Sequence, residues 1–268
     1  MTTDATLPHA ARPADEMQGH WLLARLGKRV LRPGGVGLTT RMLDQVGLRA
    51  ARVVELAPGL GLTARLMLDR GVHRYAGVDA DPDAARRVSA VVKGRGDCAV
   101  GQAHQTGLPG GEADVVVGEA MLTMQSDRGK GAIVAEAVRL LRPGGRYAIH
   151  ELALTPDDLD GDITEEIRLG LVHAIRVNAR PLTTAQWRAL LESHGLEIVW
   201  VGHAPMALLQ MRRNLVDEGP ARTLRIVRNV LRDGDARRRV LHMRRIFRTY
   251  RDHLSGVAIV ARKPEEQP

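Results

Sequence analysis

The chain has 268 residues, 44% of them apolar and 26% charged, so it can bury a sizeable core and is neither fibrous nor disordered. Its single cysteine, Cys98, excludes an internal disulfide and a paired-thiol metal or redox site. The formal net charge of +8 is local, because residues 212–251 hold thirteen arginines against four acidic residues.

The length fits one large α/β domain with insertions. No run of apolar residues is long enough for a signal peptide or a membrane-spanning helix. We therefore expect a cytoplasmic protein without a transmembrane segment.

The first 47 residues predict an N-terminal tail followed by a helical cap. Residues 1–15 are polar and contain proline, as frayed termini do. Residues 17–27 carry apolar side chains at helical spacing, residues 31–35 are a turn sequence, and residues 39–46 again follow a helical pattern. Two short helices are therefore expected ahead of the main domain.

Residues 48–263 alternate short apolar runs with helical patterns, which predicts a mostly parallel sheet covered by helices on both faces. The expected fold class is α/β, a Rossmann-like doubly wound sheet of seven strands. A basic helical insertion at about residues 206–253 precedes the last strand. The strands are expected at residues 52–56, 75–78, 98–101, 113–118, 146–152, 197–201 and 256–261, and the helices at 62–70, 82–92, 131–141, 163–177 and 184–194.

The strongest motif lies where the first predicted strand ends. Residues 53–64 run from a buried strand through a turn containing Gly59 and Gly61 into a helix. Glycines let the backbone approach a ligand closely, and the start of the helix offers free N–H groups. In doubly wound folds this is the edge of the sheet where nucleotides bind.

Two carboxylates refine this prediction. Asp79 ends the second strand, 24 positions after Glu55, which is close to the spacing at which a carboxylate accepts ribose hydroxyls. Glu55 precedes the glycines, where it would repel the pyrophosphate of a dinucleotide and attract a cation. The pair therefore favours a cationic nucleoside such as S-adenosylmethionine.

Five sequence blocks, in order and spacing, resemble the class I S-adenosylmethionine-dependent methyltransferases, and within them the small-molecule and quinone-biosynthesis branch. The resemblance covers about residues 50–153 and continues more weakly to Lys263. The blocks are residues 55–61 (ELAPGLG), 77–79 (GVD), 101–103 (GQA), 108–109 with 113–118 (LP and ADVVVG), and 141–147 (LRPGGRY).

The resemblance implies S-adenosylmethionine as cofactor and a role for each matching residue. The backbone of Ala57, Gly59 and Gly61 should face the methionine part of the cofactor, with Glu55 reaching it directly or through water. Ala57 stands where many relatives have glycine, and its methyl group leaves slightly less room in the turn for a ligand.

The remaining cofactor residues should hold the nucleoside. Asp79 is expected to bind the ribose hydroxyls and Ala80 to touch the adenine. Gln102 and Ala103 match a Gly-Asp-Ala block of the family, so the amide oxygen of Gln102 would replace a carboxylate beside the adenine amino group.

A methyl group on sulfonium is already activated, so holding the acceptor in line with it supplies much of the acceleration and a general base is optional. The candidates for that base lie at the ends of predicted strands: Glu119, His150 and Glu151. Each also has a structural interpretation as a hydrogen-bonded residue at a strand end. His150 and Glu151 should point to opposite faces, because side chains alternate along a strand.

The acceptor is expected to contact His20 and Trp21 in the cap, Met121 after the fourth strand, and Arg176 after a later helix. Each of these side chains also has a packing interpretation. No ligand spacing typical of a metal site occurs, so we predict no metal.

The arginine-rich segment at residues 212–251 leaves three interpretations open: a solvated helical face, a surface for an acidic or lipid-like substrate or a membrane, and a grip on RNA. Its apolar residues recur at helical spacing, which predicts that they pack inward. They are Leu224, Val227, Leu231, Val240, Met243 and Phe247.

The sequence thus predicts an S-adenosylmethionine-dependent methyltransferase acting on a small molecule. Two alternatives stay open, an RNA methyltransferase that uses the arginine-rich insertion and a non-catalytic S-adenosylmethionine-binding protein.

Overall fold

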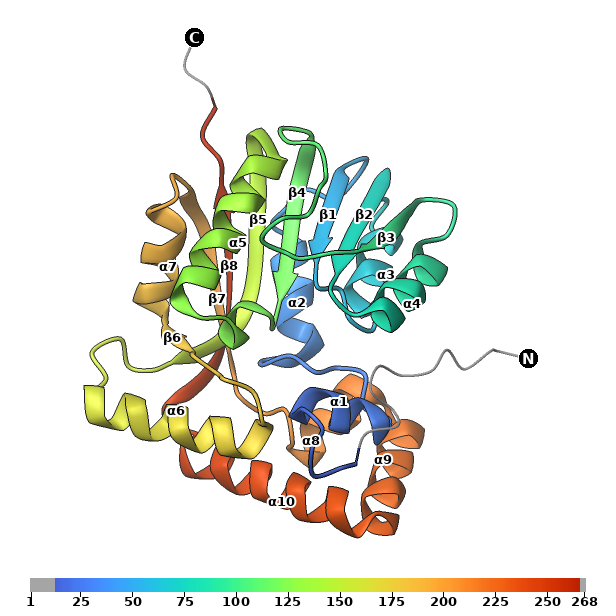
Figure 1. The fold of residues 1–268 in the computed structure, drawn as a ribbon, viewed down its shortest axis with the longest axis vertical. Helices are drawn as coiled ribbons and strands as arrows, with labels where there is room; N and C mark the ends of the chain where they lie inside the picture. Colours follow the sequence, from blue (N-terminus) through green and yellow to red (C-terminus); the bar gives the residue numbers. More distant parts are fainter. Residues whose placement is uncertain (1–12, 266–268) are drawn as a thin grey trace.

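The computed structural model describes residues 13–265, so most of the predicted N-terminal tail lies outside the described residues. The core is an eight-stranded sheet with the order β3-β2-β1-β4-β5-β8-β7, and β6 pairs with the end of β5 (Figure 1). The strands are β1 Arg52–Leu56, β2 Arg74–Asp79, β3 Gly96–Val100, β4 Ala113–Glu119, β5 Leu141–Leu154, β6 Leu182–Thr183, β7 Glu197–Pro205 and β8 Leu254–Arg262.

The predicted Rossmann-like fold is confirmed. β8 runs antiparallel to β5 and β7, while the other described strand pairs are parallel. The chain order reverses between β1 and β4, and such a reversal leaves a crevice at the carboxyl ends of the two strands. The short strand β6, which has only two residues, was too brief to predict from periodicity and raises the count from seven to eight.

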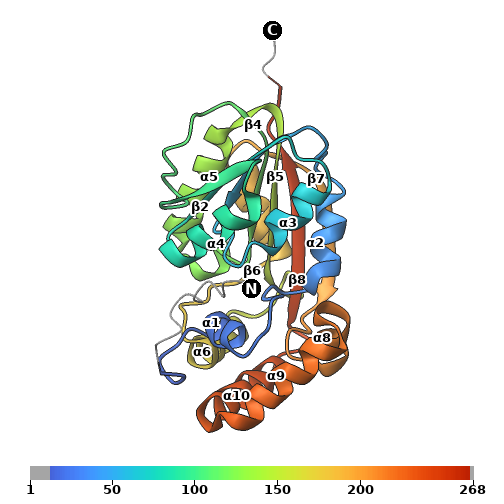
Figure 2. The same ribbon diagram turned by 90° about the vertical axis from the view of Figure 1, so that its right-hand side faces the viewer.

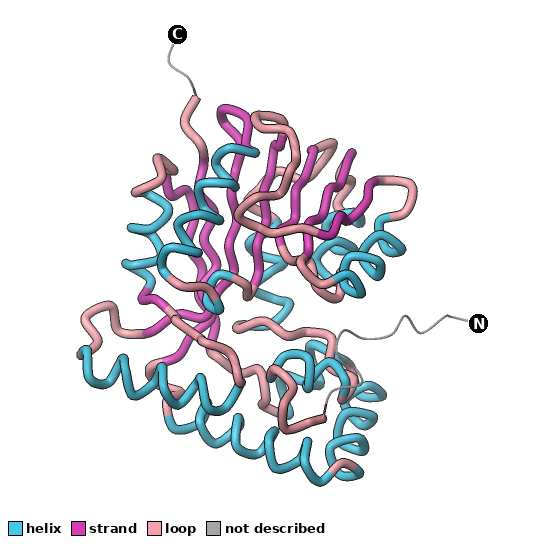
Figure 3. The backbone as a smooth tube through the Cα atoms, in the orientation of Figure 1, coloured by secondary structure: helices cyan, strands magenta, loops and turns pink. Residues whose placement is uncertain are grey.

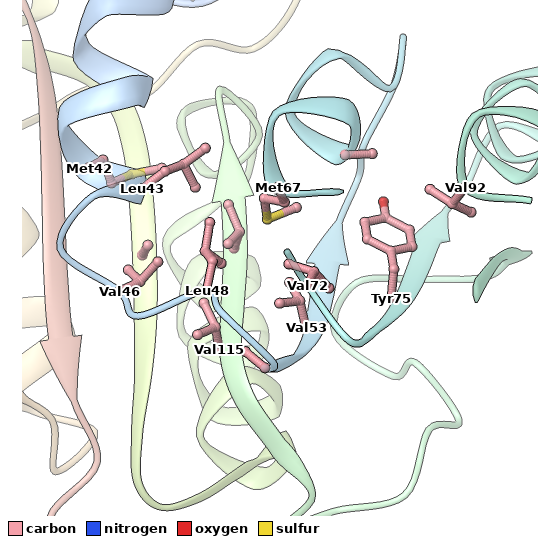
Figure 4. Close-up of a cluster of buried hydrophobic side chains, with 14 of the residues drawn as sticks. Met42, Leu43, Val46, Leu48, Val53, Met67, Val72, Tyr75, Val92 and Val115 are labelled. Atoms are coloured by element: carbon pink, nitrogen blue, oxygen red, sulfur yellow. The ribbon is translucent and has the colours of Figure 1, made fainter. Parts of the chain in front are cut away.

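Helices cover both faces of the sheet. α2 Gly35–Leu43, α3 Leu62–Asp69 and α4 Pro82–Val92 pack on one face, through side chains such as Met42 and Met67 (Figure 4). α5 Asp127–Leu140 and α7 Thr184–Glu192 pack on the other face, where Trp187 is fully buried. Figure 2 shows α5 on the opposite side of the sheet from α2 and α3. Strand side chains alternate between the two cores, as period-two valine runs require.

The remaining helices form a separate layer beyond the carboxyl ends of the strands, which we call the helical layer (Figures 1 and 3). It has its own core, built from side chains such as Leu22, Leu171 and Met243. Its helices are α1 Gly19–Arg25, α6 Gly161–Ile175, α8 Met211–Glu218, α9 Pro220–Arg232 and α10 Gly234–Thr249.

The predicted cap at residues 1–47 divides between these two parts. α1 joins the helical layer, whereas α2 lies against β5, β7 and β8. α2 packs there because Leu38, Met42 and Leu43 form one buried stripe that the sheet covers.

The packing predicted for the arginine-rich segment is correct for α10 and wrong for part of α9. Met243 and Phe247 are buried, but the side chains of Leu224 and Leu231 are 71% and 62% exposed. α9 packs through the neighbouring stripe that contains Ile226, so the two leucines face outward. Within residues 13–265, no helix is both long and apolar enough to cross a membrane.

Candidate active site

A cavity of about 780 Å³ lies between the carboxyl edge of the sheet and the helical layer. Residues from β1, β2 and β4 line one side, and residues from α1, α6 and α10 line the other. Its place at the reversal of strand order is where the fold class binds ligands.

The turn after β1 brings Ala57 and Gly59 to the cavity wall, whereas Gly61 is buried against α4 and does not line the cavity. Ala57, Gly59 and Gly61 all have left-handed backbone conformations, with φ of 52°, 54° and 70°. The Ala57 N–H donates to the Val78 carbonyl over 2.8 Å, which ties the turn to β2. A Cβ on Gly59 would meet only the Ala57 carbonyl oxygen at 4.0 Å, so the space beside this glycine is open to a ligand.

Asp79 ends β2 and faces this turn. Its carboxylate accepts hydrogen bonds from the Gly59 and Asp81 N–H groups, each over 2.9 Å. Burial raises the pKa of Asp79, while these two bonds oppose the rise. The carboxylate is thus fixed in direction, lines the cavity, and keeps lone pairs for hydroxyl donors on a ligand.

Glu55 is a second buried carboxylate in the cavity wall, with 3% of its surface exposed. The Tyr75 hydroxyl donates to it over 2.7 Å. Burial nevertheless raises the pKa of Glu55 to about 7, because a charge in this position has lost most of its water.

This shifted pKa predicts how cofactor binding depends on pH. A cationic ligand binds the ionised carboxylate, so affinity should rise with pH up to about 7 and then level off. Below that pH, the dissociation constant should increase by up to about tenfold for each pH unit. Calorimetric titration with S-adenosylmethionine across this range checks it, and Glu55→Gln should remove the dependence. An identical pH profile in the variant would show that Glu55 does not meet the cation.

The nucleoside residues predicted from the family resemblance are only partly brought together. Ala80 lines the cavity beside Asp79. Gln102 is exposed and, like Ala103, lies in the turn after β3 outside the cavity wall. The structure therefore does not bring Gln102 to the cavity, and its role stays a prediction.

Glu119, at the end of β4, is held in a buried polar cluster. Thr39 and Thr63 each donate to its carboxylate over 2.7 Å, and the Arg32 guanidinium forms an ion pair with it. Burial lowers the pKa of Arg32 to about 10, so the arginine stays charged at neutral pH. Glu119 lines the cavity, but its negative charge there is balanced by the positive charge of Arg32.

His150 lies beside Glu119 in the register of β4 and β5, yet it does not line the cavity. Its Nε2–H donates to the Pro33 carbonyl, and Nδ1 lies 3.1 Å from the Thr39 hydroxyl oxygen and 3.3 Å from a Glu119 carboxylate oxygen. Full burial lowers the pKa of His150 to about 3. This imidazole is placed to hold the loop before α2, not to take a proton from an acceptor.

We therefore expect His150 to stay neutral over the physiological range. The unfolded chain binds a proton at this side chain near pH 6.5 and the folded chain near pH 3, so His150 stabilises the fold above pH 6.5 and loses that contribution between those values. Histidine ring resonances measured by NMR from pH 5 to 8 should show no titration for this residue. A midpoint near 6.5 would contradict the assignment.

Glu151 points to the opposite face of β5, as strand alternation predicts. Its carboxylate accepts from the N–H groups of Met121, Leu122 and Thr123, over 2.8–3.1 Å, and from the Thr123 hydroxyl over 2.7 Å. These bonds fix the short 3-10 helix at Leu122–Met124. Glu151 thus shapes the cavity wall after β4 and has little accepting capacity left for a substrate.

The four residues predicted to touch the acceptor all line the cavity. The His20 and Trp21 rings lie 4.9 Å apart at the start of α1, and Met121 is almost fully buried after β4. Arg176 ends α6 in a left-handed conformation with an exposed side chain. Arg29, which sequence reasoning missed, also lines this side.

Sequence reasoning also missed Arg32, Thr39 and Thr63, because nothing in their local sequence marks them as neighbours of Glu119. The turn sequence at residues 31–35 marked the position but not the contact. Among residues 13–265, no group of three metal-ligating side chains gathers.

Comparison with known proteins supplies the family. A methyltransferase-domain model matches residues 54–149. A Haemophilus influenzae protein described as uncharacterized is 32% identical over 260 residues, which is 93% of this chain and 100% of that protein. The chain belongs to the class I S-adenosylmethionine-dependent methyltransferase family. S-adenosylmethionine is its cofactor.

Two solved structures share the fold of the methyltransferase. The [4+2]-cyclase SpnF has a TM-score of 0.69 at 15% identity, covering 91% of this chain and 93% of its own. Phosphoethanolamine N-methyltransferase 2 of Haemonchus contortus, in complex with phosphomonomethylethanolamine and S-adenosylhomocysteine, has a TM-score of 0.68 at 16% identity, covering 92% and 58%. At this identity the likeness shows the fold alone.

Proposed function

We propose that the methyltransferase acts on a small molecule with an apolar body. The observation that carries the proposal is the second wall of the cavity, which the helical layer closes with mostly apolar side chains. The cavity volume of about 780 Å³ falls within the ~300–1,000 Å³ typical of small-ligand sites. The apolar side chains of this wall are Trp21, Leu23, Leu31, Met206, Leu208, Met243 and Phe247.

The acceptor also carries an anionic group in this proposal. Arg29 and Arg176 reach the cavity from the helical layer, and within residues 13–265 no carboxylate lies within 4.0 Å of either guanidinium. Arginine forks bind carboxylate and phosphate well. The Haemonchus enzyme, whose bound phosphomonomethylethanolamine is a small phosphate ester, is compatible with such an acceptor.

Residues 48–263 form the catalytic domain in this proposal, and its residues divide the work. The cofactor supplies a methyl group on a positively charged sulfur. Glu55 faces that positive charge, Asp79 orients the ribose, and the apolar wall excludes water from the acceptor.

Positioning, with no strong base, provides the acceleration. His150 does not reach the cavity, the carboxylate of Glu151 is occupied by four donors, and Glu119 is neutralised by Arg32. We therefore assign these three as positioning residues that hold the loops around the acceptor.

The proposal is tested by supplying methyl-labelled S-adenosylmethionine together with a deproteinised cell extract or, separately, total RNA. Transfer of the labelled methyl group to anionic small molecules that can be extracted into an organic solvent supports the proposal. Label only in the RNA would overturn it in favour of an RNA methyltransferase. Tight cofactor binding with no labelled product in either arm would instead indicate a binding protein.

A further inference from the structure

The outer face of α9 combines exposed leucines with exposed arginines. Leu224 and Leu231 are 71% and 62% exposed, and they lie on one line because seven residues make two helical turns. Arg225, Arg228 and Arg232 are exposed between and beside them. We call these five residues the α9 face.

The arginines of the α9 face are free of carboxylate partners. Among the described residues, no acidic side chain pairs with any of the three within 4.0 Å, whereas Arg222 on the inner side pairs with Glu218 at 3.9 Å. The neighbouring helix α10 adds exposed arginines, including Arg244 and Arg245. The field outside this part of the helical layer is therefore strongly positive.

The α9 face is held rigidly by the other side of the helix. Ile226 and Thr223 are buried against the layer, and the Asn229 amide donates to the Leu26 carbonyl over 3.0 Å. The two leucines are thus presented to solvent by a fixed helix, which lies between α8 and α10 in the helical layer (Figure 2).

We propose that the α9 face docks on an anionic membrane surface. A helix that carries leucines among arginines suits the headgroup boundary, where the leucines enter the acyl region and the guanidinium groups meet lipid phosphates. A second copy of the chain would bring like charges together. RNA would use the arginines but leave the leucines exposed, and α9 carries no aromatic side chain on which bases stack.

The α9 face is separate from the cavity. No residue of α9 lines the cavity among the described residues, whereas the next helix, α10, contributes Met243 and Phe247 to its apolar wall. The docking proposal itself does not rest on the identity of the acceptor.

The test is sedimentation of the full chain with vesicles of phosphatidylcholine, with and without phosphatidylglycerol. Binding should require phosphatidylglycerol and weaken as salt is raised. Arg225→Gln/Arg228→Gln/Arg232→Gln should weaken it roughly a hundredfold, about fivefold per arginine. Leu224→Asn/Leu231→Asn keeps every charge and should also weaken vesicle binding at least about tenfold.

Matched controls lie on the sheet domain. Arg49→Gln/Arg65→Gln/Arg74→Gln removes the same charge from exposed positions, and Val100→Asn/Val199→Asn removes exposed apolar side chains. Both controls should bind vesicles within about twofold of the unmodified chain. Retained S-adenosylmethionine binding shows that each variant is folded and separates failure of this proposal from failure of the cofactor site.

Three results would overturn the proposal. One is equal binding to both kinds of vesicle, or none. Another is an equal effect of the α9 and control arginine variants. The third is tight binding to a short RNA that the arginine variant abolishes and the leucine variant leaves unchanged, which would assign the face to nucleic acid.

Discussion

Asp79→Asn should weaken S-adenosylmethionine binding by about ten- to a hundredfold. The carboxylate is held by the Gly59 and Asp81 N–H groups and directs its free lone pairs into the cavity. A hydrogen bond to a charged acceptor contributes about 1.5–3 kcal/mol, and each 1.4 kcal/mol is tenfold in affinity. Asparagine keeps the size but loses the charge and offers an N–H₂ group to donors that need an acceptor.

Calorimetric titration of the variant with S-adenosylmethionine measures the effect. Asp83→Asn is the matched control, since Asp83 lies four residues on, outside the cavity wall, in an exposed ion pair with Arg86. It should bind the cofactor as the unmodified chain does. Equal affinities for both variants would remove Asp79 from the cofactor site.

Arg32→Met should destabilise the fold by about 3–5 kcal/mol. The change leaves the Glu119 carboxylate, whose side chain is 8% exposed, with two hydroxyl donors but without the arginine that balances its charge. Removing one partner of a buried ion pair costs about this much because the remaining charge is uncompensated. Urea denaturation of the unmodified chain and the variant measures the difference.

The double variant Arg32→Met/Glu119→Gln should recover most of that loss, since the unpaired charge is gone. Arg142→Met provides the surface comparison, because its ion pair with Asp114 is about half exposed on the arginine side. That change should cost no more than about 1 kcal/mol. Additive effects of the two buried substitutions would show that Arg32 and Glu119 do not interact.

The position of the glycine turn beside Glu55 and Asp79 could be predicted, because its signal in the sequence is local. Glu55, Gly59 and Gly61 lie within seven residues at one strand end, and Asp79 ends the next strand. Parallel strands place such ends together whatever the rest of the chain does. The turn keeps its geometry even at Ala57, where an alanine takes the left-handed backbone conformation that glycine usually adopts.

The polar cluster around Glu119 could not be predicted from sequence. Arg32, Thr39 and Thr63 come from three segments, up to 87 residues from Glu119, and meet only when α2 packs on the sheet. His150 and Glu151 were recognised as strand-end residues. Their roles depend on partners in other segments, namely the Pro33 carbonyl and the N–H groups after β4.

The helical layer shows the limit of periodicity. Apolar residues at helical spacing form a stripe along one side of a helix. On α9 two such stripes lie side by side, and their residues are offset by about one position in the sequence. Ile226 is buried against the helical layer, whereas Leu224 and Leu231 are exposed to solvent. Only the tertiary contact between α9 and the segment around Leu26 settles which stripe is buried.

The most direct test of the cofactor site is calorimetric titration of the unmodified chain with S-adenosylmethionine and, separately, with NAD at pH 8, where Glu55 is ionised. We predict micromolar binding of S-adenosylmethionine and none of NAD, whose pyrophosphate would meet the Glu55 carboxylate. Preference for NAD, or no binding of either ligand, would contradict the assignment of this cavity and of every residue placed in it.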